Sequence, residues 1–307
     1  AGFSLADGDF DFWDAKNFVE PLKINYLDYV ISSPPPPNTG MSVLQMFKLI
    51  KPFQSELKEH GSFDYLRILS NAMSISHQDR LDFNADPKFV DIPVLQKILN
   101  DKYIDSKIED IKNNVIPNSG NTDKGSTTHV NVVDKQGNWV GITHTLGWAS
   151  GVITPGLGFM YNNGMNLADP RPGNLNSIAP GKARGSNMVP TLVLKNNKPV
   201  IICGAPGGAV IVSAVFQSIL NTINYNMTPT EAVSAPRIHT ESGKVFLEAR
   251  IRSDYKEKLA ELGFDVVQEQ FPYNPMMARA QLIAIDEKSG ELSGGSDPRG
   301  GGVVYKV

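Results

Sequence analysis

Two threonine hydroxyls near the middle of the chain could together form a nucleophilic site. The runs His129–Val133 and Trp139–Thr143 alternate apolar and polar residues, and they flank a polar insert that contains Gly137. This pattern predicts a β-hairpin in which the glycine supplies the turn. Thr127 begins the first strand and Thr145 ends the second. Because opposite side chains of a hairpin in register lie about 5 Å apart, we expect the two hydroxyls to lie side by side.

A threonine hydroxyl is a weak nucleophile and needs a base to take its proton. Cleavage of the chain before Thr127 would create such a base on the same residue, because a free α-amine has an unperturbed pKa of about 8. Residues 117–126 are polar and rich in asparagine, serine and glycine, which predicts an accessible linker ending at this bond. The alternative is that Thr127 and Thr145 are ordinary strand residues, since threonine is a common strand former.

The composition is that of a globular protein, and it argues against several classes of function. The 307 residues are 41% hydrophobic and 20% charged, with a net charge of −3. The basic residues are dispersed, which argues against nucleic-acid binding. No run approaches the roughly 20 apolar residues of a membrane span. No Cys/His cluster with metal-ligand spacing occurs in the sequence, so we expect neither a metal nor another cofactor.

Three potentially reactive residues are expected to be structural. Cys203 ends an apolar run, which favours a buried, inert thiol. His129 and His144 lie close to the threonines in sequence, and we expect them to face away from the hydroxyls and to pack or lie at the surface. A phosphate site at Gly207-Gly208 is excluded, because no Lys-Ser/Thr pair follows these glycines.

Apolar periodicity and turn residues predict a layered mixture of helices and strands. Helices are expected over Val43–Ile50, Leu66–His77, Val94–Leu99, Asp101–Ile111, Ala209–Asn224 and Tyr255–Leu262, and another after the capping box that starts at Thr228. Beyond the hairpin, strands are expected over Tyr26–Ile31, Gly151–Ile153, Phe159–Tyr161, Thr191–Leu194, Val200–Cys203, Leu282–Ile285 and Val303–Tyr305.

Seven short motifs follow one another along nearly the whole chain: Pro34–Gly40, Thr127–His129, Asn162-Asn163, Ser186–Thr191, Pro206–Gly208, Ala235–Arg237 and Ser296–Arg299. In this order they resemble the γ-glutamyltranspeptidase family of N-terminal-nucleophile hydrolases. The resemblance implies an α+β fold, a four-layer αββα sandwich of two antiparallel sheets between helices. Residues 1–126 then correspond to the C-terminal part of a large-subunit region, ending in a mobile linker, and 127–307 to a small-subunit region. We expect one structural domain, and an upstream part of the large subunit to be missing.

The resemblance also implies roles for individual residues. Thr127 is the processing residue, attacking the carbonyl of Ser126, and afterwards the catalytic nucleophile. Thr145 orients it, and Gly207 and Gly208 form the oxyanion hole. Three residues are placed against the substrate: Asn163, Ser186 and Asn187. At three further positions, where γ-glutamyl-specific members carry polar or acidic side chains, this chain has Gly147, Gly164 and Leu167, so we expect weak turnover of a simple γ-glutamyl anilide.

The function implied by the resemblance is that of an amidohydrolase or acyltransferase, made as a zymogen and linked to glutathione metabolism. Its partners would be a small γ-glutamyl or related amide and, as acceptor, water or an amine or peptide. The two fragments would stay associated after cleavage, and the sequence leaves a homo-oligomer open. The resemblance slightly favours an extracytoplasmic, periplasmic or secreted, location. Two alternatives stay open: an acylase of the same fold that acts on a non-glutamyl amide, and an unprocessed, non-catalytic homologue.

Overall fold

The computed structural model describes residues 18–93, 97–117, 126–241, 243–286 and 289–307. Most of the predicted linker, residues 118–125, and part of the predicted helix Val94–Leu99 lie outside these ranges. The predictions made for those residues are therefore not addressed by the structure.

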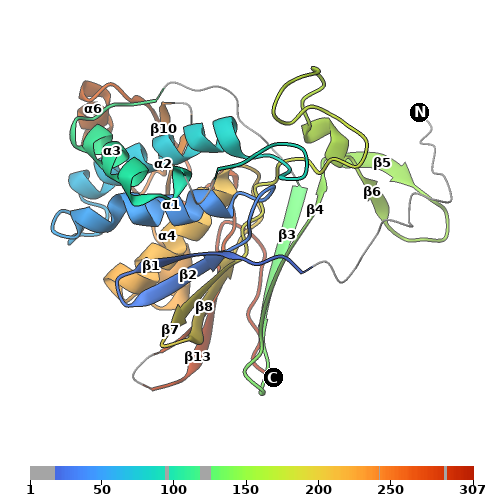
Figure 1. Ribbon diagram of the computed structural model, residues 1–307. Helices are drawn as coiled ribbons and strands as arrows, with labels where there is room; N and C mark the ends of the chain where they lie inside the picture. The colour runs from blue at the N-terminus through green and yellow to red at the C-terminus, as the bar shows by residue number, and fades with distance from the viewer. Residues whose placement is uncertain (1–17, 94–96, 118–125, 242, 287–288) are drawn as a thin grey trace.

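A six-stranded antiparallel sheet forms the centre of the molecule (Figure 1). Its strands run in the order β1-β2-β7-β8-β12-β13. Their bounds are β1 (Leu22–Tyr26), β2 (Tyr29–Ser33), β7 (Thr191–Lys195), β8 (Lys198–Gly204), β12 (Gln281–Ile285) and β13 (Leu292–Ser296). Asn196 and Asn197, with φ of 50° and 60°, make the tight turn between β7 and β8, as the strand twist of a two-residue hairpin requires.

Helices cover one face of this sheet: α1 (Gly40–Ile50), α2 (Phe63–Phe83), α3 (Asp101–Lys112) and α4 (Val210–Tyr225) (Figure 1). Helix α1 is buried on nearly all sides, because it lies between the sheet and other helices. Phe47 of α1 contacts Tyr26 of β1 and Phe216 of α4, with ring centroids 4.8 and 4.9 Å apart. The hydrophobic core draws residues from both sides of residue 126.

The predicted hairpin packs on the other face of the sheet. It consists of β3 (Ser126–Val133) and β4 (Trp139–Gly147). The ring of His129 lies over Gly204 of β8, where a side chain would overlap it. The outward face carries four roughly half-exposed aliphatic residues: Val130, Val132, Val140 and Ile142. Within the described ranges, helices, sheet and hairpin make three of the four expected layers.

Smaller elements surround these layers. Strands β9 (Ile238–Glu241), β10 (Lys244–Leu247) and β11 (Asp265–Gln268) form a three-stranded sheet, and β5 (Ala149–Ile153) pairs with β6 (Met160–Asn162). The remaining helices are α5 (Pro229–Ser234) and α6 (Asp254–Glu261), with short 3-10 turns η2 (Lys51–Phe53), η4 (Gly164–Leu167) and η5 (Pro275–Met277). Helix α5 has the predicted capping box at Thr228.

Two strand predictions are wrong. Residues 26–31 are not one strand, because Leu27 has a φ of 53° and the chain turns there between β1 and β2. Residues 303–305 form no strand. Instead Val304 packs its side chain against the open face of Gly294 in β13, so its apolar character reflects side-chain packing and not strand pairing.

Replacing Gly204 by alanine tests the joint between hairpin and sheet. The new methyl group would overlap the His129 ring, so we expect Gly204→Ala to lower the free energy of unfolding by about 1–3 kcal/mol. Urea unfolding followed by circular dichroism measures it. His129→Ala removes the ring, so the double variant should lose less than the sum of the two single losses. Strictly additive losses would show that the two residues do not meet.

Candidate active site

The two threonine hydroxyls meet as the hairpin register predicts. Thr127 lies opposite Thr145, and the Thr127 hydroxyl donates a hydrogen bond to Thr145 Oγ1 at 3.1 Å. The same oxygen accepts the backbone N–H of Gly147 at 2.9 Å. Thr145 is thereby held by its own strand while it contacts Thr127, so it can fix the position of the Thr127 hydroxyl.

The strand register breaks at the bond that was predicted to be cut. Thr127 pairs with Thr145, but Ser126 pairs with Gly147, which leaves Leu146 as an extra residue in β4. Such bulges re-aim side chains and are frequent beside active sites. Gly147 has a φ of 69° and approaches Gly164, whose Cα would lie 3.1 Å from a Cβ at residue 147. Residue 147 therefore favours glycine, both for its backbone conformation and for this close approach.

The turn before α4 presents two unpaired N–H groups. Gly207 has a φ of 149° and Gly208 a φ of 68°, which are backbone conformations that favour glycine. Within the described ranges, the N–H of neither glycine makes a hydrogen bond. The turn also leads into the N-terminus of α4, where further backbone donors are unpaired. Such a turn can bind the oxyanion of an acyl-transfer reaction.

Ala278 fixes this turn from behind. A Cβ at Gly207 would lie 2.5 Å from Ala278 Cβ and 2.8 Å from its Cα. The backbone N–H of Arg279 donates to the carbonyl of Pro206 at 3.1 Å. Ala278 itself has φ 62° and ψ 176°, a conformation that is nearly restricted to glycine. The close packing thus places a strained residue directly against the predicted oxyanion hole.

A small cavity brings most of the predicted site residues together. Its wall includes Thr127, Thr145, Gly208, Ser186 and Asn187, and it is completed by Gly147, Leu167, Arg184, Met188 and Ile211. Gly207 adjoins this wall through Gly208 but does not line it. Asn163 is not brought into the cavity either. Its backbone N–H donates to the carbonyls of Leu146 and Trp148 at 2.8 and 3.2 Å, which holds the start of η4 against the end of β4.

Arg184 is a site residue that the sequence did not reveal. It lines the cavity beside Gly164, and its Nε would lie 3.4 Å from a Cβ at that position. Its Nη1 donates to the carbonyl of Gly185 at 2.8 Å. Arg184 therefore adds a positive charge to a cavity wall whose other predicted side chains, Ser186 and Asn187, are neutral. A basic residue two positions before Ser186 was the available signal, but nothing in a loop sequence shows which side chains turn inward.

Arg80 is a second residue that was missed, and it belongs to a buried charged network. From α2 its Nη1 donates to Asn187 Oδ1 at 2.5 Å, and its Nη2 lies 3.1 Å from Glu241 Oε1. His239 bonds both Glu241, at 3.3 Å, and the Ser213 hydroxyl of α4, at 2.7 Å. Burial raises the pKa of Glu241, but the bond from His239 and the nearby positive charges outweigh it and lower that pKa overall. Asn187 is thus held by Arg80, whose own position is fixed by its ion pair with Glu241.

The prediction for His129 was right about packing and wrong about direction, whereas His144 lies at the surface as predicted. His129 is two residues from Thr127, so both side chains face the same side of β3. His129 is buried, bonded to Thr143 Oγ1 and Asn131 Oδ1 at 2.8 Å each, and its pKa is lowered by burial. It therefore serves as a packing residue between hairpin and sheet. His144 is exposed.

Cys203 is buried, as predicted, and burial raises the pKa of its thiol to about 12. In the described part of the chain, no three His, Cys, Asp or Glu side chains are grouped so that they could hold a metal ion. None of the helices found there has the length and apolar character to cross a membrane.

Comparison with known proteins agrees with this geometry. The family model of gamma-glutamyltranspeptidase matches residues 2–307. The chain belongs to the gamma-glutamyltranspeptidase family. It is 31% identical over 333 residues to the glutathione hydrolase proenzyme of Bacillus subtilis (strain 168), covering 100% of this chain and 56% of that protein. It is 34% identical over 296 residues to the acylase ACY 1 proenzyme of Pseudomonas sp. (strain V22), covering 94% and 52%.

The fold is similar to that of a solved acylase. Cephalosporin acylase from Bacillus halodurans matches with a TM-score of 0.79 at 25% identity, covering 92% of this chain and 52% of that one. The α+β N-terminal-nucleophile hydrolase fold that the motifs implied is thereby confirmed. The chain spans about half the length of the curated relatives it matches.

Ala278→Gly tests whether the oxyanion turn is held by a strained neighbour. Glycine adopts φ 62° and ψ 176° freely, so the substitution should release the backbone strain. Glycine also costs conformational entropy on folding, and we expect a net rise of about 1 kcal/mol in the free energy of unfolding. Thermal and urea unfolding measure it. Ala280→Gly, two residues on at a position without positive φ, is the matched control and should lose stability. If Ala278→Gly lowered the free energy of unfolding as much as Ala280→Gly does, residue 278 would not be strained.

Proposed function

We propose that the chain is an amidohydrolase or acyltransferase whose nucleophile is Thr127, freed by self-cleavage after Ser126. The observation that carries the proposal is the 3.1 Å hydrogen bond between Thr127 and Thr145 at the edge of a cavity that also contains Gly208. Acyl transfer needs a nucleophile, a base and oxyanion donors; the cavity supplies the first and the last, and cleavage would supply the base as the α-amine of Thr127. Membership of the gamma-glutamyltranspeptidase family supports the same assignment.

Processing would begin with attack of Thr127 Oγ1 on the carbonyl carbon of Ser126. The C–N bond breaks, the amide nitrogen takes the hydroxyl proton, and an ester joins Ser126 to Thr127. Water then hydrolyses this ester, which leaves a carboxylate on Ser126 and a free α-amine on Thr127. The register break at residues 126 and 127 supports the proposal, because the scissile peptide is the place where the ladder is irregular.

Turnover would repeat the same chemistry on an external amide. The α-amine of Thr127 accepts the hydroxyl proton as Oγ1 attacks the substrate carbonyl, and it returns the proton to the leaving amine. The N–H groups of Gly207 and Gly208 stabilise the tetrahedral oxyanion, a contribution of about 3 kcal/mol for one such donor in other enzymes. Water, or an amine acceptor, then releases the acyl group from the Thr127 ester.

The two fragments would stay together after cleavage. The hydrophobic core is shared between residues before and after 126. Arg80 from the first fragment holds Asn187 and Glu241 of the second. Separating the fragments would expose the shared apolar core to water and break the ion pair between Arg80 and Glu241. Cleavage therefore need not release either piece.

Thr127→Ala should remain a single chain, because the shift to the ester cannot begin without the hydroxyl. Thr127→Ser keeps a hydroxyl and should still be cut between residues 126 and 127. Thr128→Ala, at the exposed neighbouring position, is the matched control and should be processed as the unchanged chain is. Mass spectrometry under denaturing conditions distinguishes one species from two. Cleavage of Thr127→Ala at this bond would remove Thr127 from the mechanism.

A second candidate, an acylase for a non-glutamyl amide, is favoured by the charges of the cavity. A γ-glutamyl group carries a carboxylate and an ammonium. Arg184 can bind the carboxylate, but no Asp or Glu is among the described residues that line the cavity, so the ammonium has no counter-charge there. An acyl group with one carboxylate and no amine, such as a glutaryl group, is the better match. The acylase relatives support this candidate.

The acyl preference can be measured with two anilides that differ only in the α-amine. We expect kcat/KM for glutaryl anilide to exceed that for γ-glutamyl anilide by at least about tenfold, since an unpaired buried ammonium is costly. A neutral pentanoyl anilide serves as the reference substrate. Arg184→Gln should lower kcat/KM for glutaryl anilide, relative to kcat/KM for pentanoyl anilide, by about 10- to 100-fold. This factor corresponds to the usual free energy of a hydrogen bond to a charged group. Arg171→Gln is the control, because Arg171 is exposed and paired with Asp169 in the same loop. A higher kcat/KM for γ-glutamyl anilide would contradict the proposal that the chain is an acylase for non-glutamyl amides.

A further inference from the structure

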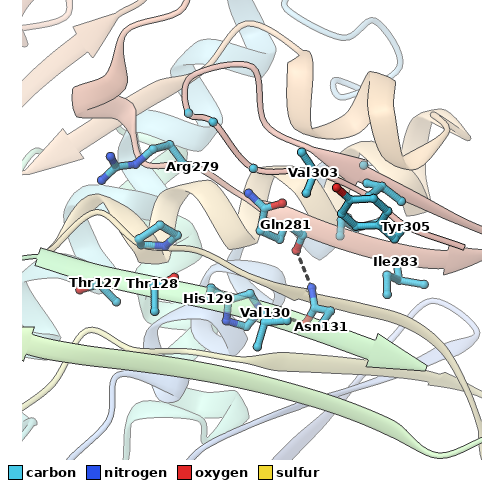
Figure 2. Close-up of a pocket in the computed structure, with 17 residues that line it drawn as sticks. Thr127, Thr128, His129, Val130, Asn131, Arg279, Gln281, Ile283, Val303 and Tyr305 are labelled. Atoms are coloured by element: carbon cyan, nitrogen blue, oxygen red, sulfur yellow. Dashed lines mark hydrogen bonds between the residues drawn. The ribbon is translucent and has the colours of Figure 1, made fainter. Parts of the chain in front are cut away.

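Thr127 lines two hollows, and the residues predicted to contact the substrate lie on one of them. The larger hollow, of about 310 Å³, lies between β3 and residues 300–305, with Thr127 at one end and Tyr305 at the other (Figure 2). Ser186 and Asn187 line the smaller hollow instead. The contacts that hold these two side chains therefore determine which groups fit beside Thr127 on that side.

The segment that carries these residues, 183–187, is held by residues that precede the predicted cleavage point. The carboxylate of Asp86 accepts the backbone N–H of Ala183 at 2.7 Å. The backbone N–H of Ser186 donates to the carbonyl of Pro37 at 2.8 Å. The backbone of this segment is therefore fixed at two points by the first part of the chain.

Arg80 of α2 fixes the orientation of the Asn187 amide. Its Nη1 donates to Asn187 Oδ1 at 2.5 Å. A guanidinium can only donate hydrogen bonds, so the amide oxygen must face Arg80. The NH2 group of Asn187 then remains for a ligand, since it makes no hydrogen bond within the described ranges. The amide thus meets the cavity as a donor.

The guanidinium of Arg80 is itself held on its other side. Its Nη2 lies 3.1 Å from Glu241 Oε1 and 2.9 Å from His77 Nδ1. Glu241 is buried and also bonded to His239, whose second ring nitrogen bonds the Ser213 hydroxyl near the start of α4. These contacts leave Arg80 little rotamer freedom, so the orientation of the amide is already set before a ligand binds.

We infer that Arg80 is a positioning residue. It holds Asn187 with the amide NH2 group toward the acyl half of the substrate, and so favours acyl groups that present a hydrogen-bond acceptor there. The inference rests on the proposed role of Thr127. Arg80 does not itself line the cavity, so it acts through Asn187. An uncharged acceptor such as a ketone oxygen satisfies the NH2 group, whereas an aliphatic group in the same place would cover it and leave it unpaired.

Two uncharged anilides of equal size test this selection. The 5-oxohexanoyl group ends in a methyl ketone, and the 5-methylhexanoyl group has a methyl in place of the ketone oxygen. We expect the unchanged enzyme to have the higher kcat/KM for the ketone. Arg80→Gln should lower the ketone-to-methyl ratio of kcat/KM by about 3- to 10-fold, the usual value of one neutral hydrogen bond, because glutamine can also accept and no longer fixes the amide. Arg80→Lys can only donate and should retain part of the ratio.

A double variant shows whether Arg80 acts through Asn187. Asn187→Ala removes the amide, so adding Arg80→Gln to it should not lower the ketone-to-methyl ratio any further. Arg67→Gln, on the same helix and paired with Asp64, is the control and should leave the ratio unchanged. An equal fall of the ratio with and without Asn187 would overturn the inference, and so would an unchanged ratio in Arg80→Gln.

A binding measurement separates this inference from the proposed function. The phenyl ethers 6-phenoxyhexan-2-one and 1-phenoxy-5-methylhexane carry the same two end groups and have no amide to cleave. Isothermal titration should show tighter binding of the ketone to the unchanged protein, and Arg80→Gln should lose that preference. This result would support the role of Arg80 even if neither anilide were cleaved, and the lack of cleavage would count against the nucleophile alone. Equal binding of the two ethers to the unchanged protein would overturn the inference.

Discussion

A buried cluster of two cations and two anions determines the geometry of the site. Arg237 contacts Asp297 at 2.8 Å, and Arg299 contacts both Asp297, at 2.9 Å, and Glu248, at 2.5 Å. All four side chains are almost fully buried. Charges are costly away from water unless every one is paired and bonded. Here every charge is paired, since Glu248 also contacts the less buried Arg250 at 2.9 Å, and the arginines also donate to carbonyls. The segments that supply these residues therefore have little freedom to shift relative to one another.

The cluster acts on the active site through one short segment. Arg237 Nη1 donates to the carbonyl of Met277 at 2.8 Å and to that of Ala278 at 3.3 Å. Ala278 is held there in a conformation nearly restricted to glycine, with its methyl group against Gly207. A strained residue persists only where its surroundings over-determine it. The ion cluster supplies that constraint, and the turn at Gly207 and Gly208 takes its shape from Ala278.

The local part of the site could be predicted from the sequence, and the long-range part could not. Alternating residues and a glycine turn define the hairpin, and its register alone places Thr127 beside Thr145. Arg80 and Arg184 reach the site through contacts that no periodicity encodes, since the bond from Arg80 to Asn187 spans 107 positions. Strands β9, β10, β11 and β13 were missed because they are only four or five residues long and, in β13, interrupted by glycine, which leaves too few positions for an alternating pattern to show.

Thr127 stands where two independently built walls meet. The wall toward Arg184 and Asn187 is formed by the loop after η4 and is anchored by Arg80 from the segment before residue 126. The wall toward Arg279 is formed by residues of β3, of β12 and of the segment 300–305, and the backbone of Arg279 ties it to the carbonyl of Pro206. The two walls share only Thr127 among their described residues. Substitutions at other residues of one wall therefore leave the residues of the other wall, and the position of Thr127 between them, unchanged.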